Sequence, residues 1–104
     1  MTDKATVEAL ADLLRPWGDV HFRAMFGEWG VYLDGRFAAI IGDGKLFLKV
    51  KGVPEETITA LFGGRTEPYP GAKNYAVALP ENFDDETWCA AVESALRVAG
   101  VLPR

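Results

Sequence analysis

Apolar and polar positions follow two different periods along this chain, and these periods separate helices from strands. Apolar residues between positions 7 and 14 recur at helical spacing; Asp3 precedes them as a candidate N-cap, and Pro16 and Gly18 end the helix. The next segments alternate or form short apolar runs, which is typical of strands. The expected strands cover residues 20–26 (a short strand or extended entry segment), 29–33, 36–41 and 45–50.

Two glycine-containing dipeptides divide these strands into hairpins. Asp34-Gly35 and Asp43-Gly44 each separate two apolar runs by two residues. The two central positions of such a turn need positive φ, which Gly adopts freely and Asp tolerates. We therefore expect a compact meander of three strands over residues 29–50.

The second half of the chain predicts helices on either side of one further strand. Helices outside a run of hairpin-linked strands indicate an α+β layer structure rather than a parallel sheet with crossover helices. We therefore expect one domain, residues 1–104, with an antiparallel sheet and helices in two layers. The expected elements are a helix that Pro54 opens and Gly63-Gly64 ends, an irregular segment at 67–71, a strand at 74–79, and a helix capped by Asp84 or Asp85 and closed by Gly100.

Tight turns also fix which residues oppose one another, so side chains can be assigned to the two faces of the sheet. Counting outward from the first turn places Val31 opposite Ala38 and Trp29 opposite Ile40. One face is almost wholly apolar and is expected to lie beneath helices; it collects Tyr32, Phe37, Ala39, Ile41, Leu46, Leu48 and Val50. The other face is mixed and collects Trp29, Val31, Leu33, Ala38, Ile40 and Phe47 beside Arg36, Lys45, Lys49 and Lys51.

The mixed face has three interpretations. In the first interpretation a helix, or an aromatic side chain such as Trp17, covers this face, as in other domains of two packed layers. Alternatively it is a protein interface with Trp29 and Phe47 as anchors and basic residues that steer toward an acidic partner. In the third interpretation, single-stranded nucleic-acid bases stack on the aromatic side chains of this face. The candidate partner-binding residues are Trp29, Val31, Ile40, Phe47, Arg36, Lys45 and Lys49.

Two blocks of the chain resemble one bacterial family, the N-terminal domain of TfoX/Sxy-type competence regulators. The blocks are Met25-Phe26-Gly27-x-x-Gly30-x-Tyr32-Leu33-Asp34-Gly35 and Lys45-Leu46-Phe47-Leu48-Lys49-Val50, with weaker echoes at Tyr69-Pro70, Lys73, Tyr75, Leu79-Pro80 and the Trp88 helix. The resemblance implies a secretion-chaperone-like fold of order α-β-β-β-α-β-β-α, with a further short strand near residues 66–69. It also implies a stand-alone module without the helical second domain of full-length competence regulators.

Composition and charge narrow the class of protein. Of 104 residues, 49% are hydrophobic, which suffices for a core without metal or disulfide staples. The net charge of −4 opposes phosphate binding and argues against nucleic-acid binding by this chain alone. No apolar run approaches a membrane span, and a single cysteine agrees with a reducing compartment, so we expect a cytoplasmic protein.

Candidate catalytic and ligand-binding residues all have structural explanations. His21 lacks partners at metal-ligand spacing, and Cys89 lies in phase with the apolar face of the last helix without an activating base. No glycine cluster is followed by the Lys-Ser/Thr of a phosphate loop. We therefore expect no catalytic, cofactor-binding or metal-binding residue. The family resemblance also includes Arg23, Tyr69 and Lys73. Two interpretations are open: these residues line a small anion pocket, or they are structural.

The function expected from these patterns is that of a small non-enzymatic module for protein interaction or regulation, which resembles the N-terminal domain of competence regulators. Its partner would be another protein or a second copy of the chain. A nucleic-acid-associated competence or transcription regulator is the first alternative, and a small ligand-binding domain is the second.

Overall fold

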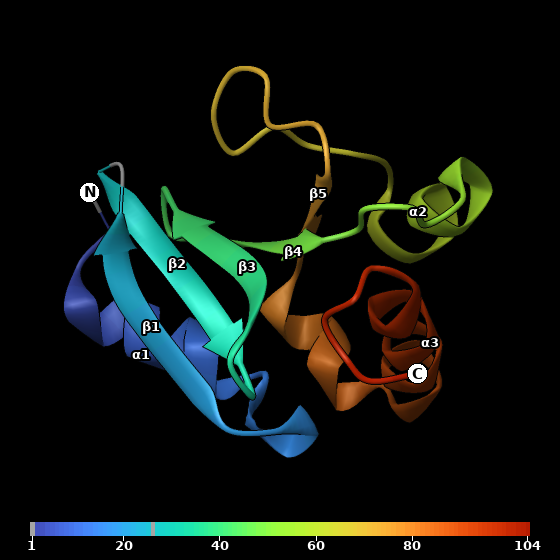
Figure 1. The fold of residues 1–104 in the computed structure, drawn as a ribbon, viewed down its shortest axis with the longest axis horizontal. Coiled ribbons are helices and arrows are strands. Elements are labelled where there is room, and N and C mark those ends of the chain that lie inside the picture. The colour runs from blue at the N-terminus through green and yellow to red at the C-terminus, as the bar shows by residue number, and fades with distance from the viewer. Residues whose placement is uncertain (1, 26) are drawn as a thin grey trace.

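The computed structural model describes residues 2–25 and 27–104, and within them it has a five-stranded antiparallel sheet with helices (Figure 1). The strands lie in chain order, β1-β2-β3-β4-β5. This confirms the expected α+β class. In chain order the elements are α1 (Lys4–Asp12), the 3₁₀ helix η1 (Arg15–Trp17), β1 (Val20–Met25), β2 (Glu28–Leu33), β3 (Arg36–Gly42), β4 (Lys45–Lys49), α2 (Glu55–Phe62), β5 (Tyr75–Ala78), the 3₁₀ helix η2 (Pro80–Asp84) and α3 (Glu86–Val98).

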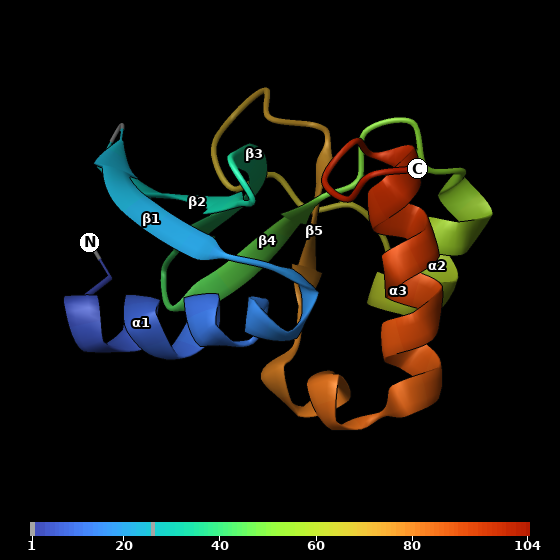
Figure 2. The same cartoon turned by 60° about the horizontal axis from the view of Figure 1, so that its bottom comes forward.

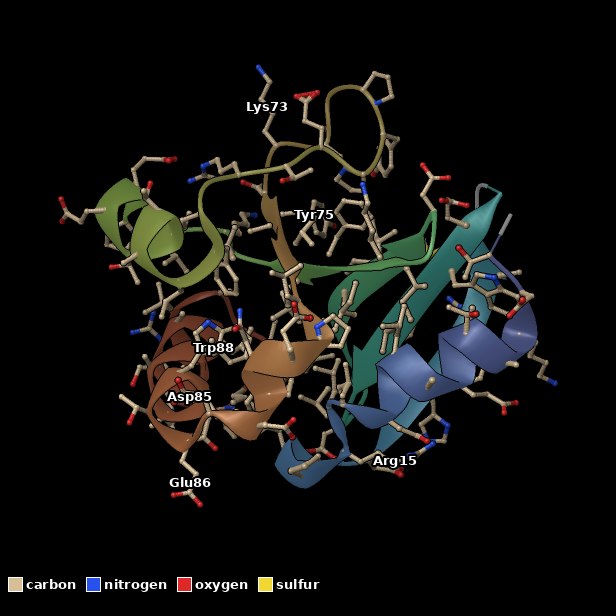
Figure 3. All side chains as sticks on the ribbon, turned by 180° about the vertical axis from the view of Figure 1, so that it is seen from behind. Arg15, Lys73, Tyr75, Asp85, Glu86 and Trp88 are labelled. Atoms are coloured by element: carbon tan, nitrogen blue, oxygen red, sulfur yellow. The ribbon has the colours of Figure 1, made fainter. Side chains whose placement is uncertain are left out.

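The helix ends follow the predicted capping residues. The Asp3 carboxylate accepts a hydrogen bond from the Thr6 amide at 2.8 Å, so α1 begins where the sequence predicts. Of the two candidates for α3, Asp85 is the cap, because its carboxylate accepts from the amides of Thr87 and Trp88 at 2.9 and 3.1 Å (Figure 3). Gly63 ends α2 in the left-handed conformation, with φ of 81°.

The order of elements differs from the implied α-β-β-β-α-β-β-α on both sides of α2. Four strands precede α2 and one follows it, so the short strand implied near residues 66–69 is wrong. The Thr66 amide does donate to the Tyr75 carbonyl at 2.9 Å, but the chain then leaves the sheet. Pro68 and Pro70 lack the amide hydrogens that would extend a ladder. In the first strand, which was predicted to reach Phe26, that residue lies outside the described part.

Both predicted turns are confirmed. Asp34 and Gly35 have φ of 50° and 81°, and Asp43 and Gly44 have φ of 51° and 69°. Positive φ at both central positions is the backbone of a two-residue hairpin turn. The second turn sets the predicted pairs, with Ile41 opposite Leu46 and Ala39 opposite Leu48.

The first hairpin departs from the predicted register because β3 contains a bulge. Tyr32 pairs with Phe37, but Val31 pairs with Ala39, so Ala38 is an extra residue in β3. Beyond the bulge every pair is shifted by one position, which exchanges the faces of the side chains that follow. Trp29 consequently pairs with Ile41 and shares a face with Leu48, contrary to the predicted assignment.

One side of the sheet, which we call the helix face, packs on α1 (Figure 2). Val31, Leu33 and Ala38 are buried in the main core there, although they were predicted for the mixed face. Trp29 packs against the same core, and its indole N–H donates to the Thr2 carbonyl at 3.0 Å. Of the predicted apolar face, Ala39, Ile41, Leu46, Leu48 and Val50 are confirmed in this core.

The opposite side, which we call the loop face, lies beneath the loop of residues 63–74 (Figure 2). Ile40 and Phe47 are only 4% and 5% exposed, yet they lie outside the main core cluster. Tyr32 and Phe37 belong to this face rather than to the predicted apolar face. Their rings meet edge-on, with the ring centres 5.4 Å apart. A loop, and neither a helix nor Trp17, therefore covers part of this face.

The remaining helices lie beside the β5 end of the sheet. There α2 and α3 pack against each other (Figure 1), and the Trp88 indole N–H donates to the Leu61 carbonyl at 2.8 Å. None of the helices in the described part of the chain has the length and apolar character needed to cross a membrane.

The face assignment predicts that two aromatic truncations destabilise the fold to very different extents. Trp29→Ala removes the hydrogen bond to Thr2 and the edge-on contact with Phe22 at 5.8 Å, so we expect a loss of about 3 kcal/mol in the free energy of unfolding. Tyr69→Ala truncates a side chain that is 47% exposed, so it should cost less than about 0.5 kcal/mol. Urea unfolding followed by circular dichroism measures both, and equal stability of the two variants would contradict the assignment.

Candidate functional site

A cavity of about 510 Å³ lies on the loop face, between the sheet and the 63–74 loop. Strands β1, β2, β3 and β5 contribute its floor and walls, and the loop contributes Tyr69. We call it the sheet pocket; its lining residues are Met25, Glu28, Phe37, Ile40, Tyr69 and Tyr75.

Two glycines leave room for side chains that line the sheet pocket. A Cβ atom at Gly30 would collide with the Met25 sulfur and lie 3.1 Å from Cε1 of Phe37. A Cβ atom at Gly42 would collide with the carboxylate of Glu28, whose Cδ would be 2.7 Å away. The side chains of Met25 and Glu28 therefore lie across bare backbone. A side chain at position 30 would therefore clash with side chains on the loop face.

Aromatic rings form most of the wall. Phe37 comes from β3, Tyr75 from β5 and Tyr69 from the loop, so rings from three separate segments converge. Figure 3 shows Tyr75 on the sheet side of the loop and Lys73 extending away from it. This convergence depends on the loop, because Tyr69 reaches the pocket only if residues 63–74 fold back over β3.

The electrostatics of the sheet pocket are simple. Glu28 is the charged side chain among the six lining residues. Burial raises the pKa of the Tyr75 phenol above its usual value of 10.0, and the neighbouring Tyr69 adds to the increase. Tyr75 therefore stays neutral and able to donate a hydrogen bond at neutral pH.

A shallower depression lies beside the sheet pocket and contains Arg23. The guanidinium of Arg23 lies 5.2 Å from the centre of the Tyr32 ring, and its Nη2 donates to the Tyr32 hydroxyl at 3.3 Å. Tyr69 lines the sheet pocket instead, and Lys73 extends away from it. The structure therefore does not bring Arg23, Tyr69 and Lys73 together as an anion pocket.

The predicted partner-binding residues are divided between the faces of the sheet. Ile40 lines the sheet pocket, and Phe47 is buried on the same face. Lys45 and Lys49 belong to this face as well, because they pair with Gly42 and Tyr75. The other three lie elsewhere: Trp29 and Val31 are on the helix face, and the exposed Arg36 pairs with the buried Leu33 beside the first turn.

The sequence interpretation missed four of the six lining residues, namely Met25, Glu28, Phe37 and Tyr75, and it considered Tyr69 only as part of an anion pocket with Arg23 and Lys73. Phe37 was assigned to the wrong face because the bulge at Ala38 is not visible in the alternation. One signal in the sequence pointed to the pocket. Tyr69 is an aromatic residue in a loop, between Pro68 and Pro70, and loops often carry binding residues.

Other reactive groups in the described residues have local structural roles. The Cys89 thiol lies 3.4 Å from the Phe83 carbonyl, and burial together with nearby carboxylates, Asp85 first, raises the pKa of this thiol, which disfavours the nucleophilic thiolate. His21 Nε2 lies 3.0 Å from the Asp19 carboxylate, and both side chains are exposed. Among the described residues, no group of three or more His, Cys, Asp or Glu could hold a metal ion.

Comparison with models of protein families gives a match over most of the chain. The family model described as the TfoX N-terminal domain matches residues 12–99. This range includes all five strands and every residue that lines the sheet pocket. A search of curated proteins found no match.

The raised pKa of Tyr75 predicts alkaline destabilisation. Since the folded chain holds this phenol proton more tightly than the unfolded chain, the stabilisation is complete below pH 10.0 and is lost as the pH rises beyond that value. Urea unfolding between about pH 9 and about pH 11 should therefore show a smaller loss of stability in Tyr75→Phe than in the wild type. Tyr69→Phe is the control and should retain most of the loss, because burial is the largest cause of the shift. Identical pH profiles for wild type and Tyr75→Phe would contradict the prediction.

Proposed function

The chain belongs to the family of TfoX N-terminal domains, and we propose that it is a non-enzymatic regulatory module that binds a partner protein through the sheet pocket. The observation that carries the proposal is the sheet pocket itself. A small domain gains stability by filling its interior, but here the overlying loop leaves a cavity of about 510 Å³ beside the sheet.

The composition of the sheet pocket supports binding. Phe37, Tyr69 and Tyr75 present aromatic surface, and aromatic anchors in desolvated pockets dominate the energy of protein interfaces. Tyr69 is 47% exposed, so an approaching partner can reach it. A side chain of the partner that enters this cavity would bury apolar surface on all sides.

The same composition offers little for catalysis. The pocket lining has one carboxylate and two phenols, and none of its six residues is a histidine, a cysteine, a serine or a lysine. Nucleophilic catalysis needs a nucleophile within hydrogen-bond reach of a base. This supports a binding role over an enzymatic one.

A small ligand-binding domain is a second candidate that the cavity favours, because small-molecule sites span roughly 300–1,000 Å³. The nucleic-acid alternative is less well supported. The charged residue in the pocket lining is the acidic Glu28, and the net charge of the chain is −4, so both oppose a phosphate backbone.

Site-specific photo-crosslinking tests this proposal. We expect Tyr69→p-benzoylphenylalanine, at the rim of the sheet pocket, to form a discrete protein adduct in an extract of the source cells. The control Glu8→p-benzoylphenylalanine, exposed on α1 behind the sheet, should not form that adduct. The Tyr69 adduct should also weaken when Phe37→Ala, checked for folding by circular dichroism, removes one wall of the pocket.

Three outcomes would overturn the proposal: no adduct, the same adduct from both positions, or an adduct that Phe37→Ala leaves unchanged. A mass increase of small-molecule size at position 69 would favour the ligand-binding alternative instead.

A further inference from the structure

We propose that the sheet pocket recognises a basic side chain of the partner protein, an arginine or a lysine. The aromatic rings of Phe37, Tyr69 and Tyr75 would surround its stem and charged end, and the carboxylate of Glu28 would pair with the charge. The inference rests on the proposed function and specifies the chemistry of the partner.

The lining matches the two parts of such a side chain. Arginine and lysine have an apolar stem that packs on hydrophobic surface and a cation at the end. Aromatic faces attract cations, and this attraction increases when the site is shielded from water. Three rings from separate segments with one carboxylate therefore favour an organic cation over a neutral or acidic group.

Glu28 lacks a charged partner among the described residues. The ion pairs within residues 2–25 and 27–104 join Asp12 to Arg15 and Glu55 to Arg65, and His21 lies beside Asp19. Glu28 takes part in none of these contacts. Its carboxylate lies over Gly42 at the sheet, partly buried beside apolar walls. A carboxylate in such surroundings gains most from a cation that enters the pocket.

The adjacent depression shows the same chemistry within the chain. The guanidinium of Arg23 lies 5.2 Å from the centre of the Tyr32 ring. Tyr32 is in edge-on contact with Phe37, a wall of the sheet pocket, at 5.4 Å. The row of rings therefore already holds one cation at its far end, and the pocket end of the row carries Glu28.

Two lysines near the pocket limit the sequence of the partner. Lys45 and Lys49 lie on the loop face next to Gly42 and Tyr75, but neither lines the pocket. Their positive charges disfavour a run of basic residues in the partner and favour acidic residues next to its arginine or lysine. The segment that fits best has one arginine or lysine between acidic or neutral residues.

Titration of the folded chain with short peptides, followed by amide NMR, tests this inference. The probe is acetyl-Glu-Arg-Glu-amide, and its neutral counterpart has citrulline in place of arginine. We expect the arginine peptide to shift the amides of Phe37, Ile40 and Tyr75 and to bind about tenfold more tightly than the citrulline peptide.

Two variants of the chain address the role of Glu28. Glu28→Gln removes the charge at constant shape, and Gly42→Ala keeps the charge but places a methyl group where the carboxylate lies. Each should reduce the affinity for the arginine peptide about tenfold and leave the affinity for the citrulline peptide unchanged. Glu8→Gln, with the same loss of charge on exposed α1, is the matched control and should bind as the wild type does.

Equal affinity for the two peptides, unchanged binding by Glu28→Gln, or no shift of the pocket amides would overturn the inference. None of these results overturns the proposed function, which the crosslink from position 69 decides separately. If the Tyr69 adduct is absent while the arginine peptide binds selectively, the pocket recognises cations but the proposed protein partner is wrong.

Discussion

The extra residue at Ala38 is the constraint on which the rest of the structure depends. A strand turns successive side chains to opposite faces, so one inserted residue reverses every assignment beyond it. Because Val31 pairs with Ala39 instead of Ala38, Trp29 lies over α1, where its indole reaches the Thr2 carbonyl. The same bulge leaves Phe37 on the opposite face, in the wall of the sheet pocket.

The two faces of the sheet are therefore covered in different ways. On the helix face, side chains from α1, the sheet and α3 fill one continuous core. On the loop face the cover is a loop with prolines, which leaves the sheet edge and arches back over β3. A loop fills space less completely than a helix does, so a cavity remains above Ile40. The glycines at positions 30 and 42 leave room for the Met25 and Glu28 side chains that line it.

This division suits a regulatory module of the TfoX N-terminal type. The main core lies on the helix face, and none of the six residues that line the sheet pocket belongs to it. Strands supply five of the six lining residues of the pocket, and the loop supplies Tyr69.

Local patterns in the sequence by themselves determined the helices, their caps and the turns. Asp3 and the Asp-Gly dipeptides act on their immediate neighbours, so their effects can be predicted from spacing alone. The family resemblance added the identity of the domain, which the family match confirms. Only the tertiary structure decided the faces and the pocket. A bulge is set by how the whole sheet packs on α1, and the convergence of Phe37, Tyr69 and Tyr75 requires contacts between residues far apart in the chain, which no local periodicity records.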